Sequence, residues 1–131
     1  MDTLEAMKGK KKQILVVDDE PAWLKSMAIM LRKEGYQVKE AQSAAEALTL
    51  LVKYRPDLIV SDLTMPDMNG FDLLDKIKKQ PTISATPVVF LSAIDDFYAR
   101  KVARELGAKA CLPKPYDKDD MVSILKQYLP Q

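Results

Sequence analysis

Hydrophobic residues along the chain alternate between short solid runs and helical stripes. Solid runs at residues 14–17, 58–61, 88–91 and 110–112, with a more polar segment at 36–41, predict five β-strands. Between and after these runs, apolar residues recur at the i, i+3, i+4, i+7 spacing of one helical face. The pattern therefore predicts five strands that alternate with five helices.

Start and stop residues mark the helices. Pro21 suits the first turn of a helix that Gly35 ends, and Ser43 with Glu46 predicts a capping box. Asp117 is placed to cap the last helix. The helix after Ser43 is expected to bury Ala44, Leu48, Leu51 and Val52, and the helix before Gly107 to bury Ala99, Val102, Ala103 and Leu106.

Strands that are apolar on both faces and separated by helices indicate an α/β fold. The sheet should be parallel, with helices packed on both sides in a doubly wound three-layer sandwich. The length of 131 residues suits one domain, which we place at residues 12–131. Residues 1–11 are rich in lysine and are expected to form a flexible basic arm.

Composition narrows the possible chemistry. The chain is 47% hydrophobic and 30% charged, and its apolar runs are too short to span a bilayer, so we expect a cytoplasmic protein without membrane contact. Its 20 basic and 19 acidic residues give a net charge of +1, which argues against a nucleic-acid partner. The lack of histidine excludes Ser-His-Asp hydrolases, Cys-His proteases and phosphohistidine carriers.

Polar residues stand at the carboxyl ends of four predicted strands: Asp18 and Asp19, then Asp62, Ser92 and Lys114. Ligands of doubly wound sheets bind beyond these strand ends, so the five side chains should converge. Three carboxylates in one place repel one another unless a cation lies between them, and oxygen ligands suit Mg²⁺. Lys114 and Ser92 opposite the metal could hold the oxygens of a phosphoryl group.

Each of these residues also has an ordinary structural interpretation. Asp18 and Asp19 could cap a helix, Asp62 could belong to a turn, and Lys114 could be a surface charge. Four such coincidences at four strand ends are less credible than one shared site. The joint placement therefore favours a functional site.

Four motifs carry a resemblance to a known family: VVDDE at residues 16–20, SDLTMPDMNG at 61–70, FLSA at 90–93 and LPKP at 112–115. In this order, each at the end of its own strand, they resemble the receiver domain of two-component response regulators. The resemblance covers the chain from about Lys12 onward. It implies a flavodoxin-like fold with strand order 2-1-3-4-5.

The resemblance also implies residue roles. Asp62 matches the phosphoacceptor, which takes a phosphoryl group from a histidine kinase or phosphotransfer protein and is not a turnover enzyme. Ser92 matches the hydroxyl that follows the phosphoryl group, and Lys114, in a cis bond to Pro115, matches the lysine that pairs with it. The Mg²⁺ ligands implied are Asp18, Asp19, Asp62 and the backbone carbonyl of Thr64. Trp23, near this metal, should be partly exposed and could report binding by its fluorescence.

Switch and tuning positions are implied at Thr64, Ala93, Ile94 and Cys111. Cys111 stands where similar proteins commonly have an aromatic residue coupled to the switching hydroxyl, so we expect the signal to pass mainly through residues 92–98. Thr64 and Ile94 match positions that influence how water reaches the aspartyl phosphate. The branched apolar side chain of Ile94 should not orient water, which predicts slow self-hydrolysis.

We expect no effector domain after Gln131, so that the output would come through partner docking or onward phosphoryl transfer by a monomer or weak dimer. The resemblance implies a docking face on the fourth helix, fifth strand and fifth helix. On the fourth helix Phe97, Arg100, Lys101 and Arg104 fall off the apolar stripe, although a solvated face is the ordinary alternative.

Three other functions are weaker interpretations. An aspartyl-phosphate phosphatase usually has a second acid two places after the nucleophile, where this chain has Thr64. A flavin-binding electron carrier would need a Ser/Thr/Gly-rich loop after the first strand, where this chain has the acidic DDEPAW. A receiver-like module that is never phosphorylated is disfavoured by the intact acidic, hydroxyl and lysine positions.

Overall fold

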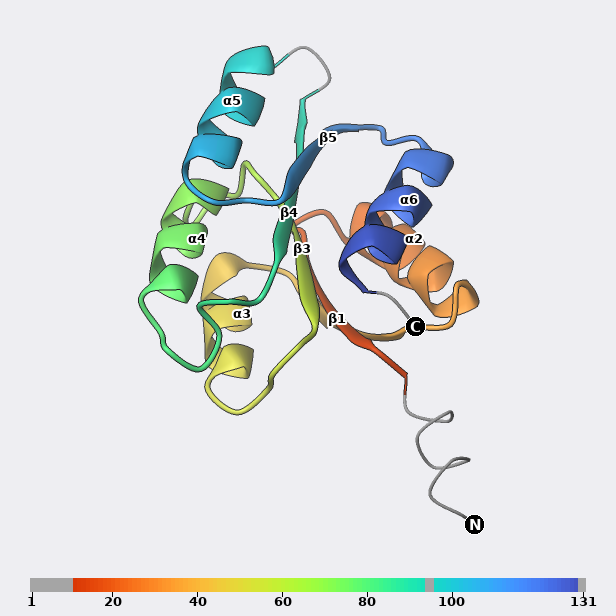
Figure 1. Cartoon of the computed structure of the whole chain (residues 1–131), viewed down its shortest axis with the longest axis horizontal. Coiled ribbons are helices and arrows are strands. Elements are labelled where there is room, and N and C mark those ends of the chain that lie inside the picture. Colours follow the sequence, from red (N-terminus) through yellow and green to blue (C-terminus); the bar gives the residue numbers. More distant parts are fainter. Residues whose placement is uncertain (1–10, 94–95, 130–131) are drawn as a thin grey trace.

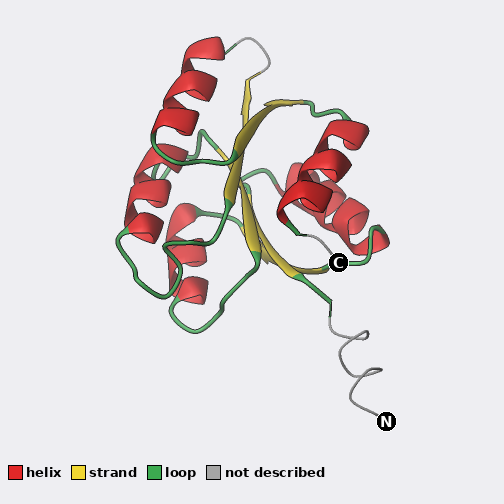
Figure 2. Ribbon diagram, in the orientation of Figure 1, coloured by secondary structure: helices red, strands yellow, loops and turns green. Residues whose placement is uncertain are grey.

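Five parallel strands form one sheet in the computed structural model, which describes residues 11–93 and 96–129 (Figure 2). The strands are β1 (Gln13–Val17), β2 (Gln37–Ala41), β3 (Leu58–Asp62), β4 (Val88–Ala93) and β5 (Ala110–Lys114). Their order is β2-β1-β3-β4-β5, which confirms the predicted order and the parallel sheet.

Five helices cover the two faces of this sheet (Figure 1). Their bounds are α2 (Pro21–Lys33), α3 (Ala44–Leu51), α4 (Gly70–Lys78), α5 (Phe97–Glu105) and α6 (Lys118–Tyr128). Helices α2 and α6 lie on one face, and α3, α4 and α5 lie on the other. The doubly wound three-layer sandwich predicted from the alternation is confirmed.

The central strands of the sheet contribute side chains to two separate hydrophobic cores, one on each face. In β1, Leu15 and Val17 pack with α3, α4 and α5, whereas Ile14 and Val16 pack with α2 and α6. This division follows from the two-residue period of a strand, because successive side chains point to opposite faces. All four side chains are at most 2% exposed, which explains why β1 reads as a solid apolar run.

Two of the predicted inner helical positions are wrong. Val52 is 65% exposed and Leu106 is 49% exposed, because α3 ends at Leu51 and α5 ends at Glu105. Each of the two residues is therefore the C-cap of its helix and lies beyond the face that packs on the sheet. In α3, Ala47 is buried in addition to Ala44 and Leu51.

The predicted caps at Ser43 and Asp117 are confirmed, since the Ser43 hydroxyl accepts the N–H of Glu46 and the Asp117 carboxylate accepts the N–H groups of Asp119 and Asp120. Gly35 ends α2 with a φ of 100°, a left-handed conformation that favours glycine.

None of the helices in the described ranges is both long enough and apolar enough to cross a membrane. The proposed arm at residues 1–11 lies, except for Lys11, outside the described residues.

Candidate functional site

The register of the sheet brings the carboxyl ends of β1, β3, β4 and β5 to one edge. Val17 pairs with Ser61, Asp62 pairs with Leu91, and Ala93 pairs with Lys114. Asp62 and Lys114 are the last residues of β3 and β5, and Asp18 follows β1 directly. This edge is where the sequence places the candidate site.

Burial sets the candidate site apart from ordinary surface charges. Asp18 is 4% exposed, Asp62 8% and Ser92 3%, and the side chain of Lys114 is 11% exposed. Asp and Lys are rarely buried to this degree unless they are paired. A buried carboxylate needs a partner of opposite charge, and for Asp18 and Asp62 this partner is the Lys114 ammonium.

The Lys114 ammonium lies among three carboxylates. Its Nζ is 3.0 Å from Asp18 Oδ2, 3.2 Å from Glu20 Oε1 and 3.5 Å from Asp62 Oδ2. The same Nζ lies 4.7 Å from the centre of the Trp23 ring, a cation–π contact. The bond from Lys114 to Pro115 is cis, as the resemblance implies, and Trp23 is partly exposed, as predicted.

Asp62 is held in an environment that opposes its ionisation. Burial raises the pKa of the Asp62 carboxyl, and the negative charge of Asp18 raises it further. The positive charge of Lys114 and a hydrogen bond from the Thr64 N–H lower the pKa without cancelling the effect of burial. An ionised Asp62 is therefore a carboxylate with little solvation, held next to one ammonium.

The acidic side chains form a group that could hold a metal ion. Carboxylate oxygens of Asp18, Glu20 and Asp62 all lie within 4.8 Å of one another. Mg²⁺ lies about 2.0–2.1 Å from its ligand oxygens, so two ligands of one ion are at most about 4.2 Å apart, and these carboxylates would have to move closer together to bind it. Three carboxylates match the oxygen ligands that Mg²⁺ prefers, and the site fits this ion.

Glu20 was not among the candidate residues chosen from the sequence, whereas Asp19 was. Asp19 is half-buried and is not part of the group of three carboxylates. Glu20 stands next to Asp19 in VVDDE, so the only sequence signal for it was its place in that motif. Because Pro21 follows it, Glu20 stands just before a predicted helix, and this local position does not indicate a role at the site.

Residues 14–126 match the family described as the response regulator receiver domain. The chain belongs to this family. It is 37% identical to an uncharacterized 14.6 kDa protein of Leptolyngbya boryana, over 98% of this chain and 94% of that protein. It is also 37% identical to the transcriptional regulatory protein GlrR of Escherichia coli, over 95% of this chain but only 28% of that protein.

A solved structure supports the same assignment. The crystal structure of a putative response regulator from Chloroflexus aurantiacus aligns with a TM-score of 0.88 at 30% identity. The alignment covers 93% of this chain and 100% of that one. This receiver domain therefore shares both its sequence pattern and its fold with the family, which is one of two-component signalling.

Ser92, the residue expected to carry the switching hydroxyl, is in contact with Cys111 of β5. Cys111 Sγ lies 3.5 Å from Ser92 Oγ, and the Ser92 hydroxyl lies 3.5 Å from the carbonyl oxygen of Ala93. Burial raises the pKa of the Cys111 thiol, which favours the neutral, donating form. Ile94 lies outside the described residues, and the slow self-hydrolysis tied to it stays a prediction.

The loop after Asp62 is tied to a neighbouring helix by Asp67. Its Oδ2 accepts the N–H of Ala45 at 3.0 Å, and its Oδ1 accepts the N–H of Ala44 at 3.4 Å. Asp67 thus caps α3 across 22 residues of sequence, in addition to the local cap at Ser43. The contact fixes the loop that carries Thr64, whose N–H bonds Asp62.

Asp67→Ala is expected to lower the free energy of unfolding by about 1 kcal/mol, because two helix N–H groups lose a charged acceptor. Urea unfolding measures the change. Asp67→Asn keeps a hydrogen-bond acceptor without the charge and should lose roughly half as much. Equal stability of Asp67→Ala and the parent protein would show that the contact contributes nothing.

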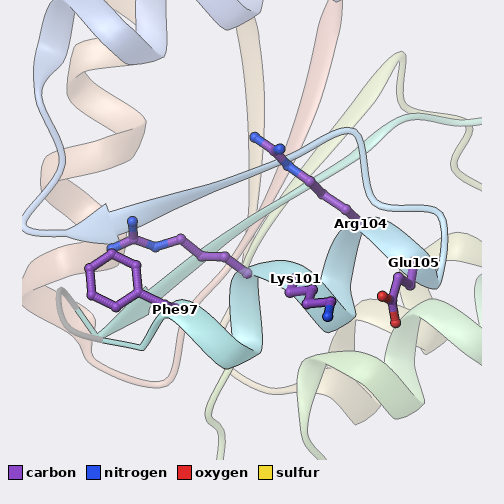
Figure 3. Close-up of a pocket in the computed structure, with 5 residues that line it drawn as sticks. Phe97, Lys101, Arg104 and Glu105 are labelled. Atoms are coloured by element: carbon purple, nitrogen blue, oxygen red, sulfur yellow. The ribbon is translucent and has the colours of Figure 1, made fainter.

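Helix α5 carries a shallow hollow on its exposed side, with a volume of about 380 Å³ (Figure 3). Its lining residues are Phe97, Arg100, Lys101, Arg104 and Glu105. The Phe97 side chain is 72% exposed, and the Arg100 guanidinium lies 5.0 Å from the centre of its ring. The four residues expected on a docking face thus surround one hollow that is mainly basic, with one exposed ring.

Proposed function

We propose that this receiver domain accepts a phosphoryl group on Asp62 from the phosphohistidine of a histidine kinase or phosphotransfer protein. The observation that carries the proposal is the placement of Asp62 at the tip of β3. There it lies 3.5 Å from Lys114 and within 4.8 Å of two further carboxylates. A nucleophile for phosphoryl transfer needs such a fixed position beside positive charge.

Transfer joins one Asp62 carboxylate oxygen to phosphorus while the bond from phosphorus to the donor's imidazole nitrogen breaks. The donor histidine leaves as neutral imidazole after it takes up a proton. The Lys114 ammonium then pairs with the phosphoryl oxygens, and the Thr64 N–H holds the Asp62 carboxyl in its orientation. Because Asp62 starts poorly solvated, it does not have to shed a full hydration shell before it attacks.

Mg²⁺, when bound, would neutralise negative charge on the transferring oxygens. The residues proposed to hold it are Asp18 and Asp62, with Asp19 and the Thr64 carbonyl as further ligands. Asp18 and Asp62 are brought together by β1 and β3, which are neighbours in the sheet. Without a cation, the carboxylates of this group would repel one another. Mg²⁺ and the Lys114 ammonium would both reduce this repulsion.

For the output we propose docking of an acidic partner segment on the face formed by α5, β5 and α6. The hollow around Phe97 offers Arg100, Lys101 and Arg104 to acidic side chains, and one exposed ring to an apolar side chain. The Cys111 thiol, which contacts Ser92 from β5, links the switch hydroxyl to this face. Movement of Ser92 toward a phosphoryl group would break that contact.

The deciding experiment is the intact mass after incubation with Mg²⁺ and acetyl phosphate. We expect the addition of one phosphoryl group, stable in acid and labile in base, and no addition when EDTA removes the metal. If the mass does not change although Mg²⁺ binding shifts the Trp23 fluorescence, the proposal is wrong. The chain would then be a receiver-like module that works without phosphorylation.

A further inference from the structure

The contacts of the Lys114 ammonium are uneven. Its distance to Asp62, at 3.5 Å, is the longest of its three carboxylate contacts. Its shorter contacts, at 3.0 and 3.2 Å, are with Asp18 and Glu20, and the centre of the Trp23 ring lies 4.7 Å from it. A charge-assisted hydrogen bond is about 2.7–2.9 Å long, so by distance the ammonium lies nearer to the two carboxylates that precede α2 than to Asp62 of β3.

Glu20 is oriented toward Lys114 and not toward its own helix. It is the N-cap residue of α2, yet its side chain makes no capping hydrogen bond. Its backbone is fixed instead, since the Glu20 N–H donates to Asp18 Oδ1 at 2.9 Å, and Pro21 follows as the first helical residue. The Glu20 carboxylate thus does not cap α2 and contacts the Lys114 ammonium instead.

Trp23 adds an aromatic surface at the same place. The face of an indole ring attracts a cation more strongly than other aromatic side chains do. Trp23 follows Glu20 by three residues, one helical turn, so the carboxylate and the ring approach Lys114 from the same end of α2. Neither residue is among the Mg²⁺ ligands proposed above, although a Glu20 oxygen lies in the same group of carboxylates as Asp18 and Asp62.

We propose that Glu20 and Trp23 form a holding site for the Lys114 ammonium that competes with the phosphoryl group on Asp62. The inference rests on the proposed function, because the competitor is the phosphorylated Asp62. In the unphosphorylated protein Lys114 stays at the holding site even when Mg²⁺ takes over Asp18 and Asp62. Phosphorylation moves it toward β3, so the holding site lowers the stability of the phosphorylated form. Glu20 and Trp23 are thus positioning residues that act through Lys114.

The test measures the affinity for beryllofluoride, a mimic of the aspartyl phosphate, at saturating Mg²⁺. Glu20→Gln and Glu20→Asp should each bind it roughly two- to fivefold more tightly than the parent, the range that a partly exposed ion pair allows. Glu20→Asp keeps the negative charge but shortens the side chain by one methylene group. A tighter affinity in both variants therefore identifies lost contact, and not lost charge, as the cause.

Lys114→Met serves as the background that removes the competing ammonium. There the substitution of Glu20 should have no effect on beryllofluoride affinity. The inference is overturned if the effect persists in this background, or if Glu20→Asp binds like the parent. It is also overturned if the substitutions only weaken Mg²⁺ binding, because Glu20 would then be a metal ligand.

Fluorescence separates failure of this inference from failure of the proposed function. Trp23 is the only tryptophan, so its emission reports this one place. Without metal or beryllofluoride, Lys114→Met should shift the emission, and Glu20→Gln should shift it part of the way. Unchanged emission in both would show that the holding site does not exist. If the shifts occur but the parent never binds beryllofluoride, the proposed function fails, and the competition fails with it.

Discussion

Asp62→Asn is expected to abolish phosphorylation and at the same time to stabilise the fold at neutral pH. The loss of phosphorylation follows because an amide oxygen is too weak a nucleophile to replace a carboxylate. The gain in stability follows from electrostatics. Burial raises the pKa of the Asp62 carboxyl, so ionisation of this group costs more in the folded than in the unfolded protein.

The size of the stability gain depends on pH. Because the folded pKa of Asp62 lies above the unfolded one, the cost of ionisation is fully present at neutral pH and disappears as the pH falls below the ordinary value of 3.8. Asparagine carries no charge at any pH and avoids this cost. The stability difference between Asp62→Asn and the parent should therefore be largest at neutral pH and vanish in acid.

Urea unfolding across this pH range, together with intact mass after treatment with acetyl phosphate, measures both effects. Asp57→Asn is the matched control, since Asp57 lies before the other end of β3 and its carboxylate accepts the N–H of Gln13 at 2.8 Å. This control should be phosphorylated like the parent and should not be stabilised. A phosphorylated Asp62→Asn, or one less stable than the parent at neutral pH, would contradict the account of the site.

The sheet and the edge that carries the site could be predicted from the sequence because both depend on short-range patterns. Parallel strands share one carboxyl edge, so finding Asp62 and Lys114 at strand ends was enough to place them near each other. The ends of the helices were harder to predict. The apolar stripe runs on through Val52 and Leu106, yet both helices stop one residue earlier, where capping and not periodicity decides.

Contacts that depend on side-chain direction could not be predicted in this way. Glu20 reaches Lys114 across 94 residues, and Asp67 reaches Ala45 across 22. In both cases the local sequence favours an ordinary role, for Glu20 as an acid just before a helix and for Asp67 as a turn residue. Which way such a side chain points is set by partners from distant segments, and no spacing within VVDDE or MPDMNG encodes it. The functional roles assigned to the site residues Asp18, Asp19, Asp62, Thr64, Ser92 and Lys114 remain predictions.

Gly70→Ala is expected to lower the free energy of unfolding by about 1–3 kcal/mol, as overpacking of a tight core does. A Cβ at Gly70 would lie 2.7 Å from Phe90 Cε1, 2.9 Å from Leu63 Cδ1 and 3.1 Å from Leu63 Cα. Neither neighbour gives way easily. Phe90 is fully buried in a T-shaped ring contact with Phe71, and the Leu63 carbonyl accepts the Gly70 N–H at 2.7 Å.

Gly35→Ala separates this steric effect from the general cost of replacing glycine. An added Cβ at Gly35 meets nothing within 4 Å, but its φ of 100° is unfavourable for alanine, so a loss of about 1 kcal/mol is expected there for conformational reasons. Phe90→Leu removes the ring atom that clashes at Gly70. In the Gly70→Ala protein, Phe90→Leu should restore part of the lost free energy of unfolding. In the Gly35→Ala protein, it should lower the free energy of unfolding further.

Urea unfolding of the parent, the three single variants and the two double variants gives the coupling energies. A favourable coupling between residues 70 and 90 with none between 35 and 90 would establish that Gly70 is required by the close approach of β3, β4 and α4. If Phe90→Leu lowers the free energy of unfolding equally in both proteins, the crowding at Gly70 is relieved by other residues. The tight packing of Gly70 against Phe90 would then not be what holds the start of α4 next to the site.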